Sequence, residues 1–199
     1  MTPVFARVLG AEFDRLPAPV PALHVVLDER HWQGMATVTR GRSLVARIAC
    51  ACVGFPASAT SVPVTVSMRL ADGEERWERN VAGRRFRSVL SPAGPAGSGL
   101  IHERFGPLRC EIGLSRDGGR LLYPVARAWL FGIPVPRRLL PKSETAESAA
   151  DGIVRFDVRI SLPLCGPIIH YAGWPEDTRL RMPPSSTAST KAPPPPTRG

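Results

Sequence analysis

The feature that most restricts the fold is proline, which occurs 22 times in 199 residues. Proline fixes φ and has no backbone N–H, so it interrupts helix interiors and central strands. A bundle of long helices is therefore excluded. Two mostly apolar stretches, 130–141 and 162–174, are both interrupted by proline and glycine. Apolar side chains on such irregular backbone typically line a cavity mouth or close the end of a barrel.

Length and composition predict one globular domain with a short tail. Hydrophobic residues make up 43% of the chain and charged residues 22%, which is ordinary for a globular protein. A chain of this length buries one proper core but not two. From Pro183 onward the composition of proline, serine, threonine, alanine and lysine cannot form a core. We therefore expect a single β-rich domain over 1–178 and a disordered Pro/Ser/Thr-rich tail over 179–199.

Two segments have the apolar spacing of amphipathic helices. The first covers about residues 3–15 and is ended by Pro17, and the prolines that follow predict an extended crossing to Leu23-His24. The second begins after Ser43, a credible N-cap, and is stopped by Gly54 and Pro56. We expect these helices to pack on one face of a sheet or to plug one of its ends.

Most of the remaining chain has the period of two that indicates half-buried strands. The clearest alternation runs over 62–70 and ends at an Asp-Gly turn. Further strands are predicted at 24–27, 35–39, 74–81, 84–90, 100–105, 108–114, 121–130 and 154–162, with a polar loop over 142–151. The predicted fold is α+β and β-rich: a curved antiparallel sheet, or a barrel-like form, of about eight or nine strands with two amphipathic helices packed on it.

The net charge of +9 comes almost entirely from arginine. One interpretation is a partner rich in phosphate or carboxylate, and the other is the arginine-rich composition of a GC-rich genome. The arginines are scattered, and no recognition helix, finger or aromatic–basic motif accompanies them. We therefore predict no specific nucleic-acid partner.

The cysteines and the apolar runs bear on compartment. The four cysteines lack both zinc-ligand spacing and the density of a disulfide scaffold, which favours buried thiols in a reducing compartment. No signal peptide is evident at the start, and no apolar run reaches the ~20 residues of a membrane span. We expect a cytoplasmic protein with no transmembrane segment, no metal site and no cofactor.

A small set of polar and aromatic residues is the best candidate for a ligand site. Strand alternation places Glu75, Trp77 and Arg79 on one face, and it turns Glu103 inward if Ile101 and Phe105 face inward. An inward Arg79 and Glu103 would form a buried ion pair or a clamp for a ligand, with Trp77 as a wall. The alternative is a set of cross-strand salt bridges on a solvated face.

The closing apolar segments add three further candidates. His170 and Tyr171 lie beside the Pro/Gly-rich stretch, and Trp129 lies on the strand predicted at 121–130, which is apolar on both faces. A histidine there could transfer protons, whereas a lone histidine next to tyrosine is more often structural. The predicted ligand-binding residues are Trp77, Arg79, Glu103, Trp129, His170 and Tyr171, with no catalytic residue assigned.

Six blocks of sequence follow one another along the chain: Leu16-Pro17 with Leu23-His24; Gly34 with Arg40-Gly41; Glu75–Arg79 with Phe86 and Ser88; Glu103–Pro107; Gly132–Pro136 with Leu140-Pro141; and Pro163, Gly166 and His170–Trp174. Together they resemble the bacterial domain of unknown function 4166 (DUF4166), over roughly residues 3–175. The resemblance implies no established activity, and it suits an accessory module because similar domains occur alone or fused to oxidoreductase-like or membrane segments. This chain has Asn80-Val81-Ala82-Gly83 where the family favours phenylalanine and glycine, which predicts an altered hairpin tip.

These observations predict a non-catalytic module that binds an apolar or amphipathic small molecule. The first alternative is an enzyme in which Glu103 works with His170 or Arg79 in acid–base chemistry, which requires these side chains to converge on one cavity. The second is an interaction module for an oxidoreductase or a membrane-associated protein.

Overall fold

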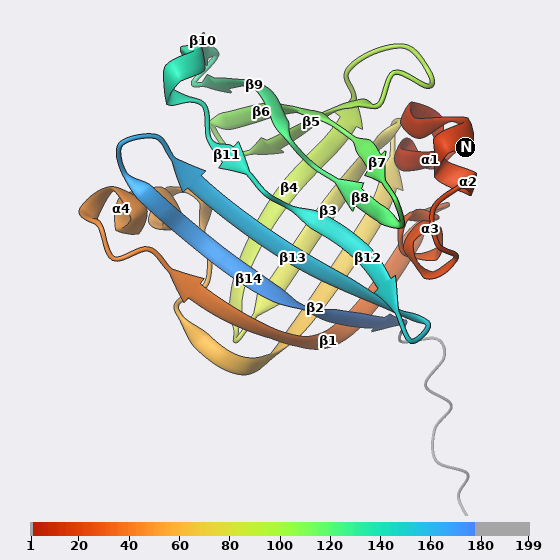
Figure 1. Cartoon of the computed structure of the whole chain (residues 1–199), viewed down its shortest axis with the longest axis horizontal. Helices are drawn as coiled ribbons and strands as arrows, with labels where there is room; N and C mark the ends of the chain where they lie inside the picture. The colour runs from red at the N-terminus through yellow and green to blue at the C-terminus, as the bar shows by residue number, and fades with distance from the viewer. Residues whose placement is uncertain (1, 178–199) are drawn as a thin grey trace, which may run out of the picture.

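The computed structural model describes residues 2–177, and every strand in that range belongs to one antiparallel sheet. The sheet curls around a concave side, with three short helices at one end of the long axis and a fourth helix at the other (Figure 1). The tail predicted over 179–199 lies outside the described residues. Among the described residues no helix is long and apolar enough to cross a membrane.

The elements follow one another along the chain with short connections. The helices are α1 (Val4–Leu9), α2 (Ala11–Asp14), α3 (Pro19–His24), α4 (Leu44–Val53) and the 3₁₀ turn η1 (Arg137–Leu139). The strands are β1 (Glu29–Arg40), β2 (Ala59–Ala71), β3 (Glu74–Val81), β4 (Arg84–Pro92), β5 (Leu100–Phe105), β6 (Leu108–Gly113), β7 (Ser115–Asp117), β8 (Arg120–Leu122), β9 (Val125–Leu130), β10 (Ile133–Pro134), β11 (Lys142–Ser143), β12 (Ala146–Ala150), β13 (Ile153–Leu162) and β14 (Gly166–Asp177).

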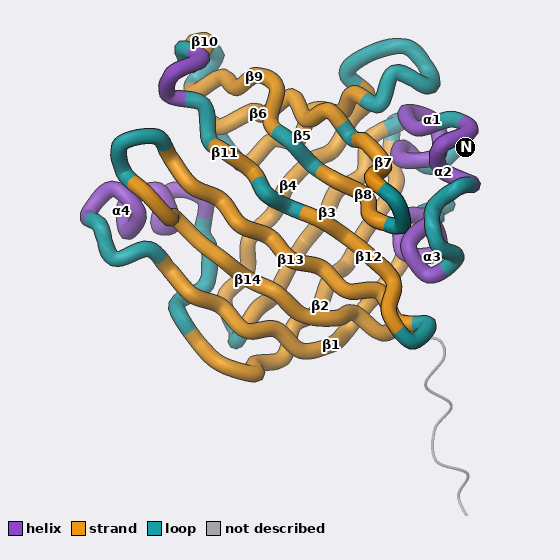
Figure 2. Tube along the Cα trace, in the orientation of Figure 1, coloured by secondary structure: helices purple, strands orange, loops and turns teal. Residues whose placement is uncertain are grey.

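The antiparallel, β-rich α+β class is confirmed, but the predicted strand number and the barrel-like form are wrong. The sheet has 14 strands and is open, in the order β10-β9-β6-β5-β4-β3-β2-β1-β14-β13-β12-β8-β7, with β11 paired to β13 (Figure 2). The stretch 121–130 is not one strand, because Tyr123-Pro124 separates β8, which pairs with β12, from β9, which pairs with β6. A proline cannot donate to a ladder, so the pairing is interrupted there.

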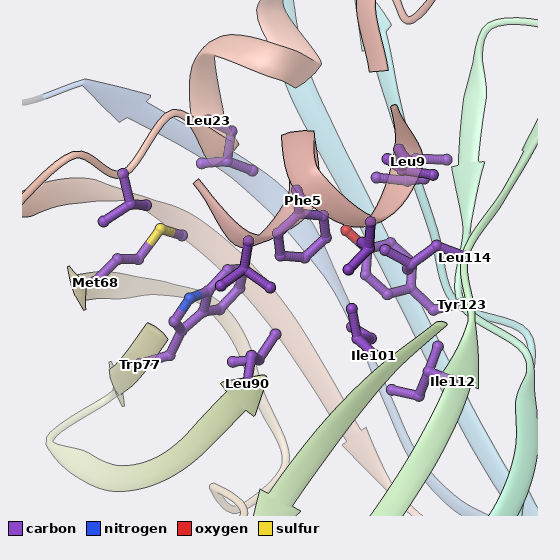
Figure 3. Close-up of a cluster of buried hydrophobic side chains, with 14 of the residues drawn as sticks. Phe5, Leu9, Leu23, Met68, Trp77, Leu90, Ile101, Ile112, Leu114 and Tyr123 are labelled. Carbon is purple, nitrogen blue, oxygen red and sulfur yellow. The ribbon is translucent and has the colours of Figure 1, made fainter. Parts of the chain in front are cut away.

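The concave side of the sheet is filled at one end by the N-terminal helices. Phe5 of α1 is fully buried and stacks on His24 of α3, with ring centroids 3.8 Å apart. The inward side chains of β2–β6, among them Met68, Trp77 and Ile101, pack around it (Figure 3). Burial of these side chains from water is the main force that holds α1 inside the sheet.

The fourth helix covers a second apolar cluster at the opposite end, and its predicted span is confirmed, although the apolar side chains Leu44, Val45 and Ile48 are exposed. Ser43 caps α4 by accepting a hydrogen bond from the backbone N–H of Ala46, and Gly54 ends it in the left-handed conformation. Ala46 and Cys50 face the sheet, where they pack with inward residues of β1, β2, β4 and β14. The concave side thus holds two apolar clusters, one at each end.

Several local predictions are wrong, among them the strand predicted at 24–27, where α3 ends at His24 and β1 begins only at Glu29. The segment after Pro17 is helical over Pro19–His24, because prolines are tolerated in the first turn of a helix. The predicted loop over 142–151 contains β11 and β12. The segment 166–177 is a long central strand, β14, in which Pro175 lies beyond the last residue paired with β13. A proline at that position removes no hydrogen bond from the β13 ladder.

Glycine allows β1 and β14 to approach each other closely. A Cβ on Gly34 would lie 1.8 Å from the carbonyl oxygen of Trp174, and a Cβ on Gly173 would lie 2.0 Å from that of Met35. No side chain fits at such distances, so the two strands would have to separate. This close contact explains why a central strand contains glycine at these positions.

We expect Gly34→Ala to lower the free energy of unfolding by about 2–3 kcal/mol, since the added methyl group meets backbone rather than a flexible side chain. Urea denaturation measures the change. Gly113→Ala is the matched control, because Gly113 is also in a strand and a Cβ there has no atom within 4 Å. Equal stability of the two variants would contradict the close approach of β1 and β14.

Candidate functional site

An ion pair lies on the concave side between the two apolar clusters. Arg79 of β3 and Glu103 of β5 meet at 3.3 Å (Nη2 to Oε1), and each side chain keeps 13% of its surface accessible. Arg79 Nη1 also donates to the hydroxyl of Ser88 at 2.8 Å. A charge this deeply buried must be paired, because an isolated one would cost several kcal/mol. The sequence prediction that Arg79 and Glu103 come together on the inner face is therefore matched by the geometry.

Aromatic rings hold the guanidinium of Arg79 in place. It lies 4.6 Å from the ring centroid of Trp77 and 5.6 Å from that of Phe86. The indole Nε1–H of Trp77 donates to Glu75 Oε2 at 2.9 Å, and the backbone N–H of Val4 donates to Glu75 Oε1 at 3.0 Å. Burial raises the pKa of Glu75 above its ordinary value of 4.5, although these hydrogen bonds and the charge of His24 oppose the rise.

Tyr171 of β14 belongs to the same interior, where its ring centroid lies 6.0 Å from that of Phe156 and 6.4 Å from that of Phe55. Its position in β14, opposite Val38 and Val158, places its ring on the concave side. Burial raises the pKa of Tyr171 to about 12, and the charges of Arg79 and Glu103 also act on it. Among residues 2–177 its hydroxyl makes no hydrogen bond, which leaves a phenolic donor available.

The other two predicted site residues lie elsewhere. Trp129 is directly opposite Arg109, whose guanidinium stacks on it at 4.3 Å on the outer side of the sheet. His170 precedes Tyr171 in a strand and so faces outward, where its Nε2 is 3.0 Å from Asp157 Oδ1. The interior therefore contains four of the six predicted residues: Trp77, Arg79, Glu103 and Tyr171.

A polar cluster that the sequence did not reveal lies beneath α1. His24 Nε2 is 2.6 Å from Glu147 Oε2, and the hydroxyl of Tyr123 is 3.2 Å from the same nitrogen. Burial is the main cause that raises the pKa of Tyr123 well above its ordinary value of 10, and the charge and hydrogen bond of Glu147 add to the rise. Sequence reasoning missed Glu147 because it lies in a segment predicted to be a loop, and no motif links it to His24.

This cluster stabilises the fold and is not placed to contact a ligand. His24 is fully buried, with Phe5 stacked on its ring. It joins α3 to β12 and β8–β9 through side chains that are distant in sequence. A histidine that no solvent reaches cannot exchange a proton with a bound molecule unless α1 leaves the sheet.

The thiols and acidic groups offer no other reactive centre. All four cysteines are free, and burial raises the pKa of Cys110 to about 12, so that thiol is protonated at neutral pH. Within the described part of the chain, no group of three or more His, Cys, Asp or Glu side chains is arranged to hold a metal ion.

The outer side of the sheet has two shallow hollows of about 250 and 220 Å³, which share Val89 and Arg104. Arg104 lies directly opposite Arg109 across β5 and β6, and both line the larger hollow. Neither arginine has an ion-pair partner among residues 2–177. Like charges placed directly opposite each other destabilise a sheet.

Comparison with known proteins places the chain in a family. Residues 16–174 match the family described as a domain of unknown function (DUF4166). The chain belongs to the DUF4166 family. No curated protein and no solved structure matches it. The DUF4166 match contains the whole interior site but begins after α1 and α2, although α1 fills one end of the sheet.

Glu75 gives the stability of this DUF4166 protein a predictable pH dependence. Because its pKa is raised in the fold, its contribution to the free energy of unfolding falls as pH rises from 4.5 through the raised value. Glu75→Gln removes this titration. We expect the stability of the wild type relative to that variant to decrease with rising pH, as measured by urea denaturation between pH 4.5 and 7.5. Glu74→Gln on the outer face is the control. If the stability of the wild type relative to Glu75→Gln instead increased with pH, the hydrogen bonds to Glu75 would outweigh the effect of its burial.

The opposed arginines give a second expectation. Arg104→Glu turns a repulsive cross-strand pair into an attractive one with Arg109, so it should raise the free energy of unfolding by about 0.5 kcal/mol. Arg155→Glu is the control, because it changes the net charge equally but lies opposite Ser148. If both variants shift the urea midpoint equally, total charge explains the effect and local repulsion does not.

Proposed function

We propose that the concave side of this sheet binds a small amphipathic molecule without catalysing a reaction. The observation that supports this most directly is the Arg79–Glu103 pair, which lies between the two apolar clusters and keeps part of its surface accessible. A polar anchor surrounded by apolar side chains is the usual composition of a small-molecule site.

The inward side chains of β13 supply an apolar surface for such a molecule. Phe156, Val158 and Ile160 face the concave side but are only partly buried. By contrast, the inward residues packed under α1 are almost completely buried. Phe156 and Ile160 also pack against the second apolar cluster, so these three side chains offer partly accessible apolar surface at its edge.

The chemistry of the anchor defines the ligand's polar end. Ser88 and Glu103 already use two of the five N–H groups of Arg79, while Glu103 and the hydroxyl of Tyr171 can still accept or donate. A carboxylate, hydroxyl or amide at one end of an apolar body would be recognised by these groups. The enzyme alternative that combines Glu103 with His170 is not supported, because His170 faces outward and binds Asp157.

The chain's two tyrosines provide a matched test. The probe is 11-(dansylamino)undecanoic acid, a fluorescent amphipathic carboxylate. Tyr171→Phe should weaken its binding about fivefold with little loss of stability, because that hydroxyl has no partner in the fold. Tyr123→Phe should leave probe affinity unchanged and lower the free energy of unfolding by about 1 kcal/mol.

A third variant tests the apolar surface. Val158→Trp places a large side chain opposite Tyr171 and should abolish probe binding. Native mass spectrometry of the purified protein incubated with lipid extract should show an added mass that this variant lacks. Absence of bound mass together with absence of saturable probe binding would overturn the proposal, and so would undiminished binding by Val158→Trp.

A further inference from the structure

The connections at one end of the sheet have an unusual composition. Because the sheet is antiparallel, alternate connections lie at the same end, and α4 and β10 mark that end in Figure 1. We call it the basic end and define it by its segments: 41–58, 81–84, 105–108, 130–143 and 162–166. It contains no aspartate or glutamate and six basic residues, namely Arg42, Arg47, Arg84, Arg137, Arg138 and Lys142.

The acidic residues gather in connections at the opposite end. That end includes α1–α3 and the turns between β2 and β3, β7 and β8, and β12 and β13. Its carboxylates include Glu12, Asp14, Asp28, Asp72, Asp117 and Asp151. That end also carries Arg7, Arg15, Arg116 and Arg120, so the charge asymmetry of the fold comes from the position of the carboxylates. At the basic end, Lys142 has a carboxylate partner, Glu144, and the five arginines have none within residues 2–177.

The same end carries most of the exposed apolar surface. The described residues include ten exposed large hydrophobic side chains, and eight of them belong to the basic end. Exposed apolar residues scattered singly are ordinary, but a concentration rimmed by charge marks an interaction surface. The eight are Leu44, Val45, Ile48, Leu130, Phe131, Ile133, Leu139 and Leu164.

Two of these side chains are held at turns at a conformational cost. Phe131 has φ 51° and is 78% exposed, and Leu164 has φ 64° and is 98% exposed. The left-handed region disfavours bulky residues, and turns normally use glycine or asparagine there. Folding alone gains nothing from an apolar side chain that is both strained and exposed. Such residues indicate a function that requires the side chain itself.

We infer that the basic end docks on the surface of an anionic lipid bilayer. Phe131, Leu164 and the outer face of α4 would enter the boundary between headgroups and acyl chains, as interfacial helices do. The arginines between them would contact anionic headgroups. A second copy of this chain is disfavoured as the occupant, because two acid-free basic ends would repel each other. This inference does not depend on the proposed ligand.

The test is co-flotation of the full chain with vesicles. One set is pure phosphatidylcholine and the other contains 30% phosphatidylglycerol. Binding should be stronger to the anionic set and should weaken in 0.5 M NaCl, where surface charges are screened. Phe131→Asn with Leu164→Asn should reduce binding at least tenfold while leaving the melting temperature equal or higher, because asparagine tolerates the left-handed conformation.

Matched variants separate the apolar and charged contributions. Leu27→Asn with Ile153→Asn removes exposed apolar side chains outside the basic end and should leave binding unchanged. Arg137→Gln with Arg138→Gln should weaken binding to anionic vesicles about fivefold for each arginine.

Three results would overturn the inference. The first is no binding to either vesicle set, and the second is undiminished binding by the Phe131/Leu164 double variant. The third is self-association of the chain without vesicle binding, abolished by that variant in sedimentation velocity, which would assign the basic end to a second copy. A different result, loss of vesicle binding in both Val158→Trp and the Phe131/Leu164 variant, would support docking by the basic end. It would also show that docking is coupled to the interior.

Discussion

The insertion of α1 into one end of the curved sheet is the contact on which the rest of the structure depends. A curved sheet cannot leave its whole concave side in water, because the inward side chains of β2–β6 are apolar. Phe5 covers part of this apolar side by packing against His24 and Trp77, and the backbone N–H of Val4 donates a hydrogen bond to Glu75 Oε1. Beyond the reach of α1, the inward residues Phe156, Val158 and Ile160 of β13 and Tyr171 of β14 remain partly accessible.

The interior combines this apolar packing with several buried polar groups, some of which are paired with residues distant in the chain. Arg79 contacts Glu103 and Ser88, and His24 contacts Glu147. Breaking a buried pair by removing one partner costs several kcal/mol, so these contacts select one arrangement of the strands. Beneath α1, His24 and Glu75 are fully buried, whereas the Glu147 side chain keeps 10% of its surface accessible, close to the 13% of Arg79 and of Glu103. What distinguishes the Arg79–Glu103 pair is its position between the two apolar clusters.

Local signals in the sequence were sufficient for several elements and for the inward position of Trp77, Arg79 and Glu103. Ser43 and Gly54 mark the ends of α4, and the period of two places Trp77 and Arg79 on the same face. Other features depend on tertiary contacts that no local pattern records. Gly173 reads as a strand breaker, yet it is the residue that lets β14 pack against β1. Once β14 is recognised as a strand, the adjacent His170 and Tyr171 must face opposite sides, so they could not both line one pocket.

The separation of charge along the molecule has a consequence for how it moves in solution. The α4 end has six basic residues and no carboxylate, whereas the α1–α3 end has both carboxylates and arginines, so among the described residues the positive pole of the molecule lies at the α4 end. Within roughly 10 Å of a negatively charged surface, the distance over which salt leaves such fields unscreened, this uneven charge distribution exerts a turning torque. The molecule would therefore rotate before it touches, and its first collision with such a surface would already be made by the arginine-rich pole.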